Sequence, residues 1–256
     1  MWWLLPTLFL CGLGETIGWS GRLWSSFSPN LHKAFLMQVI SLVIAPTPFI
    51  AVVFILLSWM VVYLGPCYAR LSPKAYTPIF LSADIIALLI QSAGGSIASA
   101  ATTFARTQLG AHLLLAGIAF QLVALSVYLC LFIEFAYRYF NDKPIFRRGH
   151  TFLPFVARTK PASPKHITML SALGFVSLVL LIRSVYRTVQ LAGGWKGRIM
   201  RNELDFNLLD GMMMMLAMVA FNVAHPGRLL GPQKPALHEG SGAGKGSDVS
   251  LQRMGV

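Results

Sequence analysis

Two polar side chains within a long apolar segment are the first sign of chemistry in this sequence. Asp84 and Gln91 lie in residues 79–101, and their spacing of seven places them on one stripe of a helix that Gly95 continues. A carboxylate at membrane depth costs at least about 2.5 kcal/mol, so it normally faces a bundle interior or a watery cavity. Two interpretations stay open: Asp84 contacts a polar or cationic substrate, or it only ties neighbouring helices together.

Charged residues in two later apolar segments form a predicted structural ion-pair cluster, which consists of Arg183, Arg187, Glu203 and Asp210. If successive helices alternate in direction, Arg183 and Asp210 share a depth, and the short connection between their helices makes them neighbours. We predict a partly buried ion pair that is costly to break from one side. Glu15 is a third candidate partner. The cluster is either a clamp between helices or a polar headgroup site.

Helical spacing also predicts which other residues share a helix face with these charged and polar side chains. Glu203, Asn207 and Asp210 follow an i, i+4, i+7 spacing that predicts one stripe opposite Arg187. Small residues around Gly94 predict either close helix packing or a smooth groove for an acyl chain or sterol. The candidate residues for substrate binding or translocation are Glu15, Asp84, Gln91, Gly94, Gly95 and Gln121.

The composition indicates what kind of element holds these side chains. The chain has 256 residues, of which 55% are hydrophobic and 12% charged, whereas soluble domains carry about 25% charged residues. We therefore predict a polytopic membrane protein. The net charge of +12 would suggest nucleic acid in a soluble protein, but the basic residues lie mainly between apolar segments, where they set topology. We expect no nucleic-acid partner.

Six apolar segments are long enough to cross a bilayer, which predicts an all-α bundle of six transmembrane helices. They are residues 2–18, 34–64, 77–101, 109–136, 166–189 and 204–224. The second contains Pro46 and Pro48, and dividing it there leaves two pieces too short to cross, so we predict one helix with a kink. The kink either exposes backbone carbonyls to a substrate or is satisfied by neighbouring side chains.

Basic residues in the connections predict the orientation. One set of loops and ends carries 13 Lys and Arg and the opposite set carries 7, so the first set is expected in the cytosol. We expect residues 1–227 to form the transmembrane domain and residues 228–256 a disordered cytoplasmic tail. The basic loop 141–165 is expected to lie against anionic lipid headgroups.

Enzyme and metal chemistry have no positive signal in the sequence. No serine lies in a nucleophile motif, and no His, Cys, Asp or Glu residues have metal-ligand spacing. We expect no catalytic residue, no metal and no cofactor, and therefore not an enzyme. The oligomeric state is left open.

An ordered set of short motifs resembles the fungal lipid-translocating exporter family, the aminocholesterol-resistance or RTA-like membrane proteins. The set runs from about Leu10 to Gly227. It includes Gly14-Glu15-Thr16-Ile17-Gly18-Trp19-Ser20-Gly21-Arg22, Gln38, Leu42 to Pro46, Asp84, Gln91, Gly94-Gly95, Gly110, Gly117, Gln121, Ile182-Arg183-Ser184-Val185-Tyr186-Arg187, Gly194-Trp195-Lys196-Gly197, Asn202-Glu203, Leu209-Asp210-Gly211 and His225-Pro226-Gly227.

The resemblance implies a seven-helix fold whose first helix is missing here, as in a truncated gene model or a genuine short form. Two further positions depart from the family pattern: Gln190 stands where an acid is usual, and Phe54 stands where a tyrosine is usual.

The function that the resemblance implies is movement or flipping of membrane lipids. The expected substrates are sphingoid bases or sterol-like amphiphiles, with resistance to toxic lipids as the result. The alternative is a membrane sensor or scaffold that regulates lipid asymmetry and stress signalling without transport. The expected location is the plasma membrane, with an endomembrane as the alternative.

Overall fold

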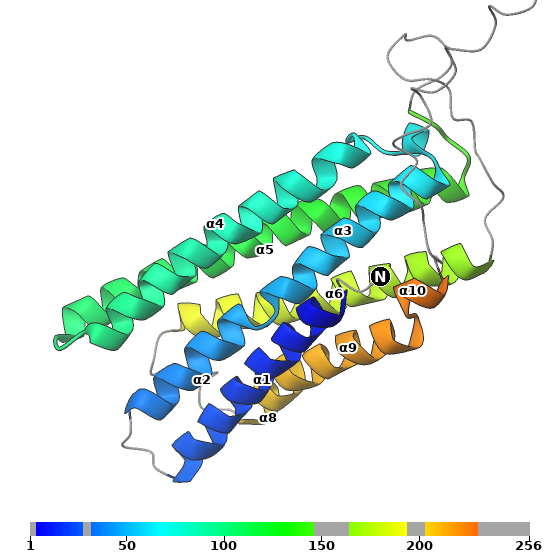
Figure 1. The fold of residues 1–256 in the computed structure, drawn as a ribbon. Coiled ribbons are helices and arrows are strands. Elements are labelled where there is room, and N and C mark those ends of the chain that lie inside the picture. Colours follow the sequence, from blue (N-terminus) through cyan, green and yellow to red (C-terminus); the bar gives the residue numbers. More distant parts are fainter. Residues whose placement is uncertain (1–3, 28–31, 146–163, 194–202, 230–256) are drawn as a thin grey trace, which may run out of the picture.

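The structure is a computed structural model that describes residues 4–27, 32–145, 164–193 and 203–229. All regular structure in these ranges is helical (Figure 1). The helices are α1 (Leu4–Phe27), α2 (His32–Ile44), α3 (Thr47–Leu64), η1 (Pro66–Tyr68), α4 (Pro73–Ala100), α5 (Phe104–Phe140), α6 (Pro164–Ala192), α8 (Glu203–Phe206), η2 (Asn207–Met212), α9 (Met213–Val223) and α10 (Pro226–Leu229). The predicted all-α bundle is confirmed.

Five stretches are long and apolar enough to cross a membrane. They are Met37–Leu64, Pro73–Ala100, Phe104–Phe140, Pro164–Ala192 and Leu204–Leu229. They cover five of the six predicted segments. The remaining segment forms α1, a helix of 24 residues that is not in this set.

Helices α4 and α5 form the most extensive pair, and they lie side by side along most of their length (Figure 1). The close approach depends on glycine. A Cβ atom on Gly94 would lie 2.5 Å from the backbone nitrogen of Leu114, and one on Gly110 would lie 2.5 Å from that of Ala98. Because helix axes can approach this closely only where side chains are absent, these glycines set the α4–α5 distance.

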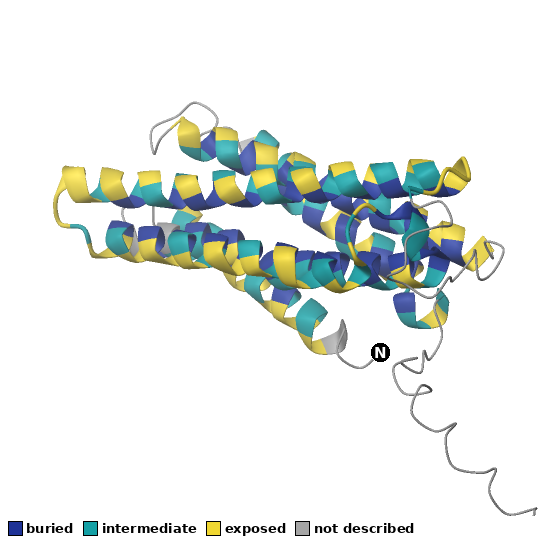
Figure 2. Ribbon diagram, turned by 90° about the horizontal axis from the view of Figure 1, so that it is seen from above, coloured by how far each residue is buried: buried dark blue, intermediate teal, exposed yellow. Residues whose placement is uncertain are grey.

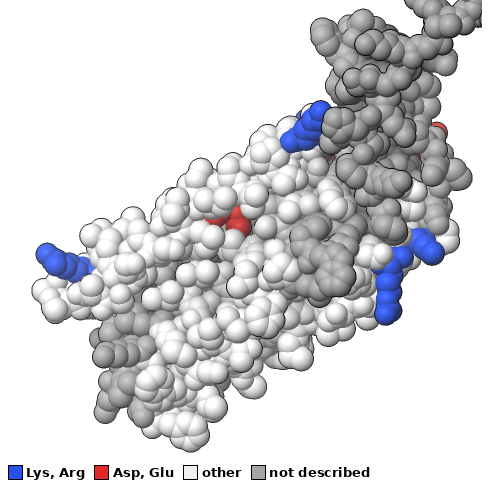
Figure 3. Space-filling model, in the orientation of Figure 1, with Lys and Arg blue, Asp and Glu red and all other residues white. Residues whose placement is uncertain are grey.

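The outward faces of the bundle are apolar. Residues coloured as exposed follow the outer sides of the helices (Figure 2), and they include Leu89 of α4, Val123 of α5 and Val223 of α9. On the face shown in Figure 3, Lys and Arg lie toward the ends and the surface between them is almost uncharged. Exposed apolar side chains over the middle of a bundle suit a lipid environment. The protein is an integral, multi-pass membrane protein.

The kinked segment contains two helices within one span. α2 ends at Ile44 and α3 begins at Thr47, with Pro46 at the N-cap of α3 and Pro48 in its first turn. Proline has no N–H to continue the helical ladder, so the break at this point follows directly from the sequence. The sequence predicted one helix with a kink at Pro46 and Pro48, whereas the structure has two helices, α2 and α3, within one candidate span.

Two of the predicted regions lie largely outside the described residues. Of the basic loop 141–165, only residues 141–145 and 164–165 are described. Of the tail 228–256, only residues 228 and 229 are described, as the end of α10. The headgroup contact of the loop and the disorder of the tail stay predictions.

Candidate functional site

Arg183 is the centre of a buried polar cluster, and each of its three nitrogens donates a hydrogen bond. Nε donates to Asp210 Oδ1 at 2.8 Å and Nη1 donates to Glu15 Oε1 at 2.8 Å. Nη2 donates to the backbone carbonyl of Leu42 at 2.9 Å. The side chain is 3% exposed. The ion pair predicted between Arg183 and Asp210 is present, and Glu15 is indeed a further partner.

Arg187, one turn along α6, binds the same carboxylate through a fork. Its Nε lies 2.7 Å from Asp210 Oδ1 and its Nη2 lies 2.6 Å from Asp210 Oδ2. Its Nη1 donates to Gln190 Oε1 at 3.4 Å. Two arginines and two acids thus balance in charge, and Asp210 is fully buried. We call Glu15, Arg183, Arg187, Gln190 and Asp210 the guanidinium cluster.

The proline break supplies one of the acceptors in this cluster. In an uninterrupted helix the carbonyl of Leu42 would accept from the N–H of residue 46, but Pro46 has none. That carbonyl accepts from Arg183 instead. The exposed backbone group is therefore satisfied by a side chain of α6, in agreement with the second interpretation of the kink.

The predicted stripe is wrong for Asn207, which does not share the buried face of Asp210, and its Glu203 part stays a prediction. Asn207–Met212 is a π-helix, whose wider turns change which residues share a face. Asn207 is exposed, while Phe206 is buried and lies 5.0 Å from the guanidinium carbon of Arg187. Glu203 begins α8, and its side chain lies outside the described part of the chain.

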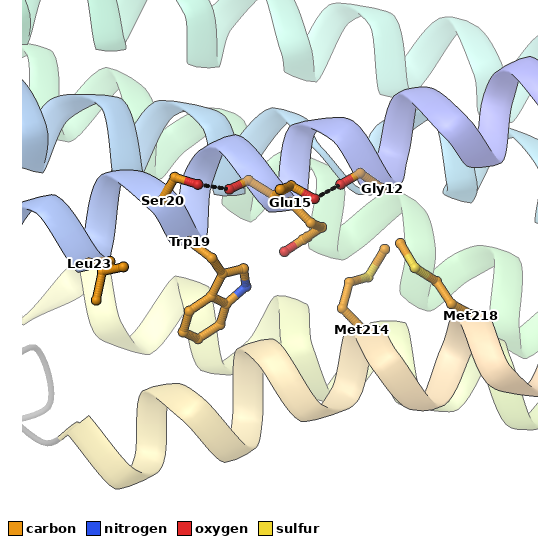
Figure 4. A pocket seen from close by; sticks show the side chains of 8 residues that line it. Gly12, Glu15, Trp19, Ser20, Leu23, Met214 and Met218 are labelled. Carbon is orange, nitrogen blue, oxygen red and sulfur yellow. Dashed lines mark hydrogen bonds between the residues drawn. The ribbon is translucent and has the colours of Figure 1, made fainter.

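A groove runs between α1 and α9 beside the cluster (Figure 4). Its volume is about 540 Å³, and its walls carry Gly12, Glu15, Thr16, Trp19, Ser20, Leu23, Met214 and Met218. In Figure 4 the side chains of Glu15 and Trp19 point from α1 toward the helix formed by η2 and α9, and Trp19 lies against Gly211 of η2. The hydroxyls of Thr16 and Ser20 bond to backbone carbonyls of their own helix. Glu15 is thus the ionisable group that borders the groove.

A second polar group lies between α4 and α5 and contains three predicted residues. Gln121 Nε2 donates to Asp84 Oδ1 at 2.6 Å, and Gln91 Nε2 donates to Gln121 Oε1 at 3.0 Å. Asp84 and Gln91 are each 2% exposed. We call these three residues the amide chain. The sequence named all three as candidate residues but did not show that Gln121 reaches Asp84.

The two glycines beside the amide chain pack against neighbouring helices. The space that a ligand would need at Gly94 is filled by the backbone of α5 around Leu114. A Cβ on Gly95 would meet Ile40 of α2 at 3.4 Å. The geometry favours the packing interpretation of this small-residue face.

Charges at the end of the bundle pair with each other and not with Asp84. Glu134 Oε1 lies 3.1 Å from Arg70 and 2.9 Å from Arg138, and all three side chains are at least a quarter exposed. Arg70 and Arg138 are therefore engaged by Glu134 at the rim.

A small cavity of about 30 Å³ separates the two polar groups. Its walls include Gln121 of the amide chain together with Arg183 and Arg187 of the guanidinium cluster. A volume of this size can hold a single water molecule. The two groups are therefore neighbours in the bundle, although they come from different helix pairs.

Metal chemistry has no visible site in the described residues. Among them, no group of three or more His, Cys, Asp or Glu side chains could hold a metal ion.

Sequence reasoning missed the π-helix, the role of the Leu42 carbonyl and the groove. No sequence pattern predicts the π-helix. Pro46 predicts that a backbone carbonyl one turn earlier lacks its helical donor, but the sequence does not show which side chain replaces that donor.

Comparison with known proteins identifies the family. Residues 8–233 match the family described as RTA1 like protein. The chain is 31% identical over 242 residues to "Sphingoid long-chain base transporter RSB1" of Saccharomyces cerevisiae, covering 86% of this chain and 63% of that protein. It is 27% identical over 223 residues to "Protein RTA1" of the same species, covering 87% of this chain and 65% of that protein. No solved structure matches.

The match covers most of this chain, but the chain spans less than two thirds of the length of these relatives. The fungal motifs, the helical bundle and the match over most of the chain agree. The chain belongs to the RTA1-like family of multi-pass membrane proteins.

Proposed function

We propose that this protein moves cationic long-chain amphiphiles, such as sphingoid bases, between the leaflets of a membrane and so lowers their toxicity. The groove between α1 and α9 is the binding site, and Glu15 receives the ammonium headgroup. The name of the relative at 31% identity, a sphingoid long-chain base transporter, supports the substrate class. The plasma membrane is the proposed location.

The hydrogen bonding of the Glu15 carboxylate is the main support for this proposal. Its Oε1 accepts from Arg183, but its Oε2 is buried and has no hydrogen-bond partner in the described part of the chain. A buried carboxylate oxygen without a donor is costly. A ligand that brings an N–H or O–H donor into the groove would satisfy it.

The guanidinium cluster favours an ammonium over a phosphate headgroup. Every nitrogen of Arg183 and Arg187 already donates to a protein acceptor. Within the cluster, the buried polar atom that lacks a partner among the described residues is Oε2 of Glu15. Because an anionic headgroup needs donors and a cationic one needs acceptors, the groove matches the cation.

The rest of the groove suits an alkyl chain. Trp19, Leu23, Met214 and Met218 supply apolar walls, and thioether side chains adapt to chains of different shape. The volume of about 540 Å³ lies within the usual range for small-molecule sites. We assign the headgroup contact to Glu15 and not to Asp84, because Asp84 lies between the closely packed α4 and α5.

The test is lipid movement in vesicles that contain the purified full-length chain. A fluorescent long-chain base should change leaflet faster with the wild-type protein than in empty vesicles. Glu15→Gln should lower the rate about tenfold or more. Gly12→Phe should do the same, because a side chain at Gly12 meets open space in the groove and would block it.

A matched control tests the groove. Leu13 is the next residue of α1 and is 46% exposed on the outer surface, so Leu13→Phe should leave the rate unchanged. Equal rates for Gly12→Phe and Leu13→Phe would exclude the groove as the site. No movement by the wild type would instead favour the sensor or scaffold alternative, and a chemically altered lipid in the vesicles would indicate an enzyme.

A further inference from the structure

The amide chain has an unsatisfied acceptor at each end. Asp84 Oδ2 and Gln91 Oε1 are both buried without a hydrogen-bond partner in the described part of the chain. Between them, Gln121 donates to Asp84 and accepts from Gln91. The series of hydrogen bonds therefore begins at the amide of Gln91 and ends at the carboxyl group of Asp84, and its unused acceptors allow one more proton to bind.

No cation compensates Asp84 among the described side chains. α4 packs against α5, α3 and α2. On α5, the nearest titratable side chain along the helix from Gln121 is Tyr128, whose hydroxyl donates to Val53, and Glu134 and Arg138 pair at the rim. On α3, Tyr63 stacks on His166.

The remaining ionisable groups are more distant from the carboxyl group. The described side chains of α2 include none that titrates. On α4 itself, Lys74 and Tyr76 lie two or more turns toward the start of the helix. Arg183 and Arg187 face Gln121 across the small cavity and are engaged by their own acids. An ionised Asp84 would thus be a buried charge with no opposite charge in contact, which proteins avoid by taking up a proton.

We propose that Asp84 is a proton-binding site, and that its proton sets the direction of the hydrogen bonds through Gln121 to Gln91. When Asp84 is ionised, Gln91 donates to Gln121 and Gln121 donates to Asp84. When a proton from water binds Asp84, the carboxyl O–H donates to Gln121 Oε1, and Gln121 donates to Gln91 Oε1. Each amide turns over about its last bond, which exchanges its oxygen and nitrogen at no steric cost.

The site also deepens the proposed function, on which this step rests. Release of a proton from Asp84 places a negative charge one side chain away from the small cavity and the guanidinium cluster that holds Glu15. With Asp84 ionised, its carboxylate adds to that of Glu15 and strengthens the attraction for a cation bound in the bundle. Binding of the cationic amphiphile and loss of the proton then favour each other, which is exchange of one cation for another.

The first test does not depend on transport. Infrared spectra of the purified full-length protein in lipid discs at neutral pH should contain a protonated carboxylic acid band that shifts in D2O. Asp84→Asn should remove the band, whereas Glu134→Gln, at the rim, should leave it. Gln121→Leu should keep the band but move it to higher frequency, because the carboxyl group loses its hydrogen-bond partner. Gln121→Leu also serves if Asp84→Asn does not fold.

The second test uses the fluorescent long-chain base in vesicles with and without a pH gradient. The wild-type rate should change about threefold or more with the gradient, and the rate of Asp84→Asn should not change. A wild-type band that survives Asp84→Asn, or one that Gln121→Leu leaves in place, would overturn the proton site even if transport is found. Stabilisation of the wild type by Na⁺ or K⁺ that Asp84→Asn removes would indicate a metal-cation site and overturn it as well.

Discussion

Asp210 is the residue whose loss should damage the fold most. Its carboxylate accepts three hydrogen bonds from two arginines, at 2.6 to 2.8 Å, and is fully buried. Asp210→Asn keeps the shape but leaves Arg183 and Arg187 with one acid, Glu15. Removing one partner from a buried ion pair costs about 3–5 kcal/mol. Because a whole domain is stable by about 5–15 kcal/mol, this one substitution removes a large share of the stability.

Two acid-to-amide substitutions at less buried positions provide a comparison for the loss of stability expected from Asp210→Asn. Glu15→Gln removes one charge-assisted bond at the edge of the groove, which is worth about 1.5–3 kcal/mol. Glu134→Gln acts on a rim acid whose side chain is 25% exposed, where ion pairs are worth about 0–1 kcal/mol. The predicted order of destabilisation is Asp210→Asn, then Glu15→Gln, then Glu134→Gln.

The assay is thermal and denaturant unfolding of the purified variants in detergent, followed by size-exclusion chromatography. Arg187→Gln in the background of Asp210→Asn restores the charge balance, so the double variant should be more stable than Asp210→Asn alone. An Asp210→Asn protein within about 1 kcal/mol of wild type, or no recovery in the double variant, would refute the view of the cluster as a balanced buried set.

Two further predictions concern packing and charge. Gly94→Ala should destabilise the protein by about 1–3 kcal/mol, because the new Cβ meets the backbone of α5 at 2.5 Å. Gly12→Ala is the control and should be neutral, because nothing lies within 4 Å of that position. Similar melting temperatures for the two variants would contradict the described α4–α5 contact. Gln190→Glu should destabilise the protein, because Gln190 is buried and a third acid would leave the cluster with an excess negative charge, although the new carboxylate can still accept from Arg187. An unchanged melting temperature in the same thermal assay would contradict the charge balance.

The sequence was sufficient for features that depend on local periodicity and depth. Apolar segments of the right length predict the spans, and Pro46 predicts the break between α2 and α3 because proline removes a backbone donor. Arg183 and Asp210 were matched because they lie at one depth on helices joined by a short connection. These inferences use neighbours in the chain, where geometry is fixed by the helix itself.

The tertiary structure decided which helices touch and what lies between them. Glu15 and Arg183 are 168 residues apart and meet only because the fold brings this level of α1, which packs on α2 and α3, within side-chain reach of α6. Gln121 reaches Asp84 because glycines bring α4 and α5 together. The missing partners of Glu15 Oε2 and Asp84 Oδ2, on which both proposals rest, can be recognised only from the packing of the described helices. Periodicity places a side chain on a face of its helix, but only the packing of several helices shows what that face meets.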